Sequence, residues 1–283
     1  MKKITREAVF AERDKKFRRT YYEDGVGGKK WVGLQTEGKR LTFSAYMDSS
    51  IKIFEAQTGL ELELPSSYQG YYRIIDEEEI AKVKAWMKDQ GTLVFLSDCL
   101  SLSVALSINF NKSDDRTPVG HLQNEGKWKE DENSICQLAD MVEQQIRNLP
   151  YYKDANLICS VPSPQGKGFD LPGKVASLAG ERVGKQNITG GFVFGGPKPS
   201  LKDVPFDEKW QVWEDAQVSF RSGDEFNIKD KTIILIDDLY QSGITIQYIA
   251  MKLQQAGARE VYGLSFVKTR GDKDNMSRNT NDE

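Results

Sequence analysis

The sequence has very few of the residues that most often bind metals or form disulfides. Its 283 residues include one histidine, His121, and three cysteines, Cys99, Cys136 and Cys159, with no CxxC pair among them. A histidine-rich metal centre is therefore nearly excluded, and a Ser-His-Asp triad would have to use His121. Cysteines spaced in this way predict neither a zinc site nor a disulfide framework, and they are typical of a reducing, cytoplasmic setting.

Long apolar segments and a strong charge of either sign are also missing. No window reaches the ~18 apolar residues of a membrane span, and the charged N-terminus lacks the apolar core of a secretory signal. The formal net charge is −3, with 39% apolar and 29% charged residues. These values predict a soluble globular protein without an overall basic surface for nucleic acid or membranes.

The N-terminal part of the chain alternates between strand-like and helix-like patterns. Residues 29–66 alternate apolar and polar side chains, which predicts an antiparallel meander. A helix is expected to begin at Asp76, with Glu79 completing a capping box, and residues 92–110 return to strand. We therefore expect a mixed, β-rich N-terminal domain over residues 1–112.

The C-terminal part alternates strands with helices. The polar stretch 113–133 is the predicted boundary, and residues 113–270 follow as a second domain. Alternating strands and helices predict an α/β fold in which crossover helices join the strands of a parallel sheet. The polar tail, residues 271–283, has nothing to bury and is predicted to be disordered.

The most informative segment is KTIILIDDLYQSGITIQYIAMKLQQAG, residues 231–257. Ile233 to Ile236 are four consecutive aliphatic residues, which predicts a central parallel strand buried on both faces. Open parallel sheets bind ligands at the carboxyl ends of their strands, where Asp237 and Asp238 lie. The next residues form a short polar loop that opens a helix, so backbone N–H groups and the helix dipole suit a phosphate.

The glycine of that loop, Gly243, is expected to let the backbone approach the bound anion closely. A phosphate cradle beside two carboxylates suits a sugar phosphate. The phosphate would bind the loop, and the ribose hydroxyls would donate to Asp237 and Asp238.

This string resembles the phosphoribosyl diphosphate (PRPP) motif of type I phosphoribosyltransferases, whose core is a Rossmann-like parallel sheet. The resemblance implies that Asp237 and Asp238 contact the ribose 2′- and 3′-hydroxyls and lie near a Mg²⁺ ion. It also implies that the loop binds the 5′-phosphate through Tyr240, Gln241, Ser242, Gly243, Ile244 and Thr245. Gln241 departs from the motif, since many members have threonine there.

A second segment, LICSVPSPQGKGFDLPGKVASLAGERVG, resembles ComF-like phosphoribosyltransferases. The matching pieces are Val161-Pro162 and the run from Lys167 to Asp170. In that branch this loop meets the diphosphate of PRPP, and a basic residue offsets the charge of the leaving group. The resemblance implies that Lys167 has this role; the alternative interpretation is an exposed lysine in a proline-rich loop.

Residues 199–220 stand where the family has a long flexible loop that closes over the site. Three lysines could bring charge to the ligand as the loop closes: Lys198, Lys202 and Lys209. Trp210 and Trp213 are more simply interpreted as packing residues of an insertion.

The resemblance implies a Mg²⁺-dependent glycosyltransferase that moves phosphoribosyl from PRPP to a nitrogenous base and releases diphosphate. Two other readings stay open: a non-catalytic regulator or partner-binding protein in DNA uptake or processing, and a nucleotide-consuming defence effector. The sequence leaves open the base, any protein partner and a homodimer. The first 112 residues are either a hood that holds the base or a separate domain for sensing or for binding a partner.

Overall fold

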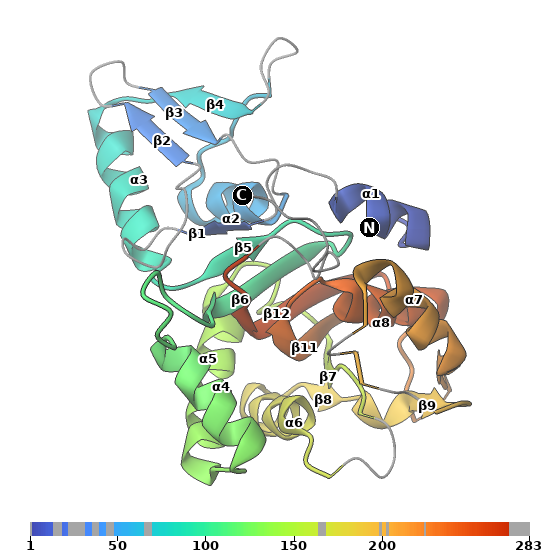
Figure 1. The fold of residues 1–283 in the computed structure, drawn as a ribbon. Coiled ribbons are helices and arrows are strands. Elements are labelled where there is room, and N and C mark those ends of the chain that lie inside the picture. The colour runs from blue at the N-terminus through green and yellow to red at the C-terminus, as the bar shows by residue number, and fades with distance from the viewer. Residues whose placement is uncertain are drawn as a thin grey trace.

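The computed structural model describes residues 2–13, 19–21, 32–35, 40–43, 48–64, 70–163, 168–197, 200–201, 204–223 and 225–271. A seven-stranded sheet has the order β1-β5-β6-β12-β11-β7-β8 (Figure 1). Its strands are Arg19–Tyr21 (β1), Val94–Leu96 (β5), Leu102–Ile108 (β6), Glu260–Lys268 (β12), Thr232–Tyr240 (β11), Leu157–Ser160 (β7) and Gln186–Asn187 (β8). From β6 to β8 all neighbours are parallel, and β1 and β5 add antiparallel pairs at one edge.

The central strand is β11, as its aliphatic run predicts. Ile236 is level with Leu264 of β12 on one side and with Ser160 of β7 on the other. Residues 232–237 are all buried, because helices cover both faces of the sheet here. The predicted α/β fold with a parallel-sheet core in the C-terminal half is confirmed.

Two helical layers enclose this sheet. One face packs against α4 (Pro118–Trp128), α5 (Glu132–Asn148) and α6 (Leu171–Val183), and Ile234 and Ile236 belong to that core. The other face packs against α1 (Arg6–Arg13), α7 (Phe206–Asp215) and α8 (Ile244–Gln255), where Ile233 and Leu235 are buried. Successive residues of β11 thus serve opposite cores.

The N-terminal part holds a small antiparallel sheet of β2 (Val32–Gln35), β3 (Arg40–Phe43) and β4 (Tyr71–Ile74). The prediction of a continuous meander over residues 29–66 is wrong at α2 (Asp48–Thr58). There Ile51, Phe54 and Thr58 are buried at helical spacing, which outweighs the local strand propensity.

The next helix, α3 (Glu77–Asp89), begins as predicted. The Asp76 carboxylate accepts from the Glu79 backbone N–H at 2.8 Å, and the Asp76 N–H donates to the Glu79 carboxylate at 3.1 Å. This is the predicted capping box.

The seven-stranded sheet contains strands from both sides of the expected boundary at residues 112 and 113. β6 precedes the boundary and pairs with β12, where Val104 is level with Leu264. The polar stretch 113–133, which marks the expected boundary, contains α4. The tail beyond residue 271 lies outside the described residues. Among the helices that the structure describes, none is long and apolar enough to cross a membrane.

Candidate functional site at the end of β11

The two aspartates lie at the carboxyl end of β11. Asp237 is buried, and its carboxylate accepts a hydrogen bond from the Asp238 backbone N–H at 2.9 Å. Adjacent residues of a strand point to opposite faces. Asp238 accordingly reaches the α4 side, where two side chains of that helix contact it.

Those two side chains, Gln123 and Lys127, lie one helical turn apart on α4. The Lys127 ammonium forms a short ion pair with Oδ2 of Asp238, and Gln123 Nε2 donates to the same oxygen at 3.4 Å. The Lys127 side chain is 31% exposed, so the pair lies at the rim of the site. Neither residue was predicted from the sequence, because both lie in the polar stretch 113–133 that marks the expected domain boundary.

α4 is brought to this point by close backbone packing. Its N-cap, Thr117, donates to the Ile108 carbonyl at the end of β6, and a Cβ on Gly120 would lie 2.4 Å from the Asn109 carbonyl oxygen. Near its other end, a Cβ on Gly126 would lie 3.1 Å from Leu171 at the start of α6. The helix therefore runs from β6 to α6 and passes the end of β11 between them.

Trp128 ends α4 beside this ion pair. Its side chain is 73% exposed, which is unusual for a large aromatic residue. The Lys127 ammonium lies 5.9 Å from the centre of the Trp128 ring. An exposed aromatic ring thus lies next to the lysine that pairs with Asp238.

The loop after β11 leads directly into α8. Gly243 is the N-cap residue, with a left-handed φ of +76°, and as a glycine it has no side chain that could cap α8. The hydroxyl of the preceding residue, Ser242, accepts from the Ile244 N–H at 3.4 Å. A Cβ on Gly243 would lie 2.3 Å from the Tyr240 hydroxyl. The glycine is therefore needed for its backbone conformation and for the space that Tyr240 occupies.

Tyr240 is part of the protein core, and its side chain is buried under the loop. Its hydroxyl lies near the enclosed carboxylate of Asp98, which also accepts from the Leu100 backbone N–H at 2.9 Å. Burial, with a smaller contribution from Glu12, raises the pKa of Asp98 to about 6. These contacts support the loop from the protein core. Tyr240 therefore stabilises the loop and does not itself face a ligand.

α7 covers the other side of the loop. Lys209 is only 2% exposed, and its ammonium donates to the Gln241 amide oxygen at 3.4 Å. Trp213 Nε1 donates to the Thr245 hydroxyl at 3.3 Å. Burial lowers the pKa of Lys209, and within the described part of the chain no carboxylate pairs with it. A buried cation thus stands beside the predicted phosphate loop.

The predicted diphosphate loop is only partly described. Lys167 lies outside the described residues, as do Lys198 and Lys202. The Val161 N–H donates to the Ile236 carbonyl at 2.8 Å, so this loop starts beside the aspartates. Asp170 accepts from the Gly173 N–H at 3.2 Å and caps α6.

A cavity of about 290 Å³ opens next to this loop. Its walls include Ser163, Asp170, Thr189, Phe194 and Arg221.

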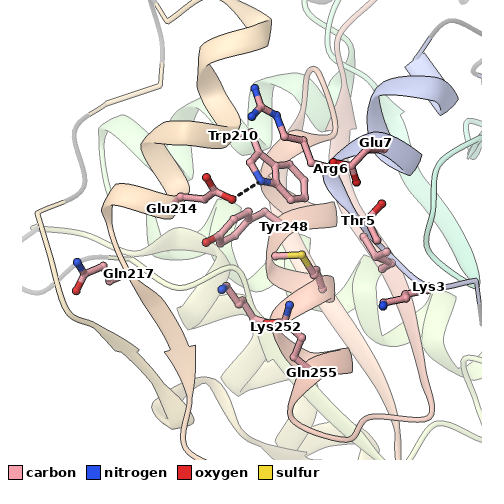
Figure 2. Close-up of a pocket in the computed structure, with 12 residues that line it drawn as sticks. Lys3, Thr5, Arg6, Glu7, Trp210, Glu214, Gln217, Tyr248, Lys252 and Gln255 are labelled. Atoms are coloured by element: carbon pink, nitrogen blue, oxygen red, sulfur yellow. Dashed lines mark hydrogen bonds between the residues drawn. The ribbon is translucent and has the colours of Figure 1, made fainter.

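A larger hollow of about 460 Å³ lies elsewhere, between the N-terminal segment, α7 and α8 (Figure 2). None of the predicted site residues lines it. Trp210 donates to the Glu214 carboxylate at 3.0 Å in its wall, and the Ile4 N–H donates to the Gln254 side chain nearby. The hollow lies at the contact between the N-terminal segment and α8.

Mg²⁺ takes oxygen ligands, usually one or two carboxylates together with substrate phosphates. Asp237 and Asp238 fit this donor chemistry, although Asp238 already shares an oxygen with Lys127. Among the described residues no group of three or more His, Cys, Asp or Glu side chains is placed to hold a metal. Any divalent ion here would therefore be bound by these two carboxylates and by the phosphate groups of a bound small molecule.

No protein-family model matches the sequence, and no curated protein matches it. Among solved structures, the chain is similar to adenine phosphoribosyltransferase from Trypanosoma brucei in complex with AMP, pyrophosphate and ribose-5-phosphate. The identity is 13% and the TM-score 0.36, over 64% of this chain and 90% of that one.

Two further solved structures show a similar level of likeness. The adenine phosphoribosyltransferase of Leishmania tarentolae is 13% identical, with a TM-score of 0.33, over 54% of this chain and 77% of that one. The glutamine PRPP amidotransferase of B. subtilis, complexed with ADP and GMP, is 15% identical, with a TM-score of 0.30, over 62% of this chain and 36% of that one. At this level of similarity, the solved structures assign no ligand or activity to this chain.

Proposed function

We propose that the protein binds a 5′-phosphorylated ribose, either PRPP or a nucleoside 5′-phosphate, at the carboxyl end of β11. One observation carries the proposal: two adjacent carboxylates near the end of β11 precede a short loop and a helix whose N-cap is glycine, with the buried Lys209 beside that loop. Anions favour helix N-termini and buried cations, and ribose hydroxyls favour carboxylate acceptors.

In this proposal each part of the ligand has its own contacts. The 5′-phosphate lies against the loop Gln241–Thr245, near the Lys209 ammonium. The ribose hydroxyls donate to Asp237 and Asp238. A base attached to C1 stacks on the exposed face of Trp128, because this ring lies next to the Lys127 ammonium that contacts Asp238.

These roles are those of a phosphoribosyltransferase-like protein. The ComF-like branch rests on the sequence of the first loop alone. With PRPP as ligand, transfer would form a C1–N bond to a base and break the C1–O bond to diphosphate. Bound Mg²⁺ would neutralise the leaving diphosphate, and Asp237 and Asp238 are the residues that would hold it. Lys167 is the proposed basic residue of the diphosphate loop.

Calorimetric titration tests the proposal, with AMP, ribose 5-phosphate and PRPP as ligands and Mg²⁺ present. The wild type is compared with the double variant Asp237→Asn/Asp238→Asn. A matched control is Glu77→Gln/Glu78→Gln, which removes two adjacent exposed carboxylates at the start of α3. We expect binding by the wild type and the control, and loss of at least about tenfold in affinity in the site variant. Equal binding by all three proteins would contradict the proposal.

A second candidate function is binding without turnover, as in a nucleotide sensor or regulatory subunit. The ion pair between Lys127 and Asp238 favours it, because one of the two proposed metal-binding carboxylates is already neutralised. Diphosphate release from PRPP in the presence of a mixture of bases separates the two functions. Release supports the transferase, and binding without release supports the sensor.

A further inference from the structure

We propose that the Lys127 ammonium is the resident cation of the ribose site, so that the protein binds a nucleoside 5′-monophosphate without a divalent metal ion. This inference rests on the proposed function. It concerns which positive charge balances Asp238 when a ligand is bound. Lys127 and a divalent ion would compete for the same carboxylate oxygen.

The contacts of Asp238 support this competition. Its Oδ2 atom accepts from both Lys127 and Gln123, two donors that the same helix places one turn apart. An opposite charge at this distance stabilises the ionised carboxylate and reduces its attraction for another cation. Mg²⁺ loses its water shell reluctantly and needs strongly negative ligands in return.

Three features keep the ammonium in place. Lys127 lies in the last turn of α4, where the helix dipole favours a positive charge. Its ammonium lies 5.9 Å from the centre of the Trp128 ring, a favourable cation–π distance. The helix itself is fixed by the tight contacts of Gly120 and Gly126, so Lys127 cannot withdraw by a shift of α4 without breaking that packing.

The charge balance then indicates the class of ligand. Lys127 on one side of β11 and Lys209 on the other supply positive charge beside the proposed ribose and phosphate positions. A third lysine of this edge, Lys268, is level with Tyr240, but its buried ammonium donates to the Thr269 and Gly271 carbonyls. A nucleoside monophosphate carries its charge in one phosphate group, which Lys209 can neutralise. A ligand with an additional diphosphate needs further cations, which is the usual role of Mg²⁺.

Manganese binding tests the competition directly, because Mn²⁺ is a spectroscopic stand-in for Mg²⁺ and free Mn²⁺ is measured by electron paramagnetic resonance. The full chain is compared as wild type, Lys127→Gln and Lys129→Gln. The control residue Lys129 follows α4 and pairs with Glu125 on the surface. We expect Lys127→Gln to bind Mn²⁺ at least about tenfold more tightly than the other two, as expected when a competing charge is removed.

AMP titration in EDTA and in excess Mg²⁺ completes the test. The wild type and Lys129→Gln should bind AMP equally in both buffers. Lys127→Gln should bind at least about tenfold more weakly in EDTA and recover affinity in Mg²⁺. Lys127→Arg keeps the charge and should behave as the wild type. If circular dichroism shows that Lys127→Gln is unfolded, Lys127→Met removes the charge with similar length.

Two results would overturn the inference: wild-type AMP binding that requires Mg²⁺, or Mn²⁺ affinities that are equal in Lys127→Gln and Lys129→Gln. If AMP binds in neither buffer to any of the proteins, the proposed function fails for monophosphates. The Mn²⁺ comparison is independent of AMP and still decides whether Lys127 holds the cation position.

Discussion

The two sides of the β11 end each hold a lysine, and the two lysines differ in what balances their charge. On the α4 side, Lys127 is partly exposed and forms an ion pair with Asp238. On the α7 side, Lys209 is buried and donates to the neutral amide of Gln241. A buried cation without a counter-ion is costly, so the α7 side is the one that needs an anion. We therefore propose that the ligand's phosphate lies near Lys209 and its hydroxyls near Asp238.

Replacing Lys209 tests the α7 side and should have the largest effect. We expect Lys209→Met to weaken AMP binding by about a hundredfold, or roughly 3 kcal/mol, because a buried charge-assisted contact is lost. The unliganded variant should be more stable than the wild type, because no charge has to be buried. Calorimetry and urea unfolding measure the two effects.

Lys252→Met is the matched control, since Lys252 lies on α8 outside the loop. Weaker AMP binding together with lower stability would mean that Lys209 supports the fold and not the ligand.

A methyl group on Gly243 should disturb the α7 side while the α4 side stays intact. The Cβ of Gly243→Ala would clash with the Tyr240 hydroxyl at 2.3 Å and force a left-handed backbone on alanine. We expect the free energy of unfolding to fall by about 2 kcal/mol or more. Gly59→Ala separates the two causes, because Gly59 has a φ of +71° with no atom within 4 Å. An equal loss in both variants would show that contact with Tyr240 costs nothing.

Trp128 tests the α4 side with a smaller expected effect. Trp128→Ala should weaken AMP binding by roughly tenfold, as expected for loss of one stacked base, and leave ribose 5-phosphate binding unchanged. Both affinities come from the same titration series. Equal losses for the two ligands would place the base elsewhere, and unchanged affinities would make Trp128 an exposed surface residue.

The pH dependence of the free energy of unfolding tests the α7 side as well, and its expected effect is the smallest. Burial lowers the pKa of Lys209 below its ordinary value of 10.5. At neutral pH the lysine is charged in both the folded and unfolded states, and the cost of burying the charge is fully present. As the pH rises from the folded pKa toward 10.5, the folded protein releases the proton first, so its free energy of unfolding rises.

The stability advantage expected for Lys209→Met should therefore shrink as the pH is raised, and urea unfolding of both proteins at increasing pH measures it. A difference that stays constant would mean that Lys209 keeps its ordinary pKa in the folded state.

The strand, the loop and the helix after it could be predicted from the sequence. The aliphatic run of β11 has no other plausible structure, and Asp237 and Asp238 lie at the strand end where the motif predicts them. The helix that follows begins at Ile244, one residue after the predicted glycine. Local pattern alone was enough here, because this segment is buried on both faces.

The α4 side could not be predicted in the same way. α4 packs through Gly120 and Gly126, so close backbone contact replaces the apolar stripe by which helices are usually recognised. Thr117 before Pro118 is an N-cap signal that could have marked its start. The contact between Lys127 and Asp238 joins residues 111 positions apart, and no local pattern encodes it.

The α7 side was anticipated only in part. Lys209 was expected to approach on a closing loop, whereas it lies on a formed helix with its side chain already buried. Trp210 and Trp213 are buried on the same helix and anchor it to Tyr248 of α8. The buried apolar residues of α7 are separated by charged and polar residues. The segment therefore resembled a loop in the sequence and not an amphipathic helix.

The most direct measurement is a crystal structure of the protein soaked with AMP. We expect phosphate density at the loop Gln241–Thr245 within hydrogen-bond distance of Lys209. We also expect the ribose at Asp237 and Asp238 and the base against Trp128. Density for AMP in the hollow beside Trp210 and Tyr248, with the β11 end unchanged, would contradict the proposal.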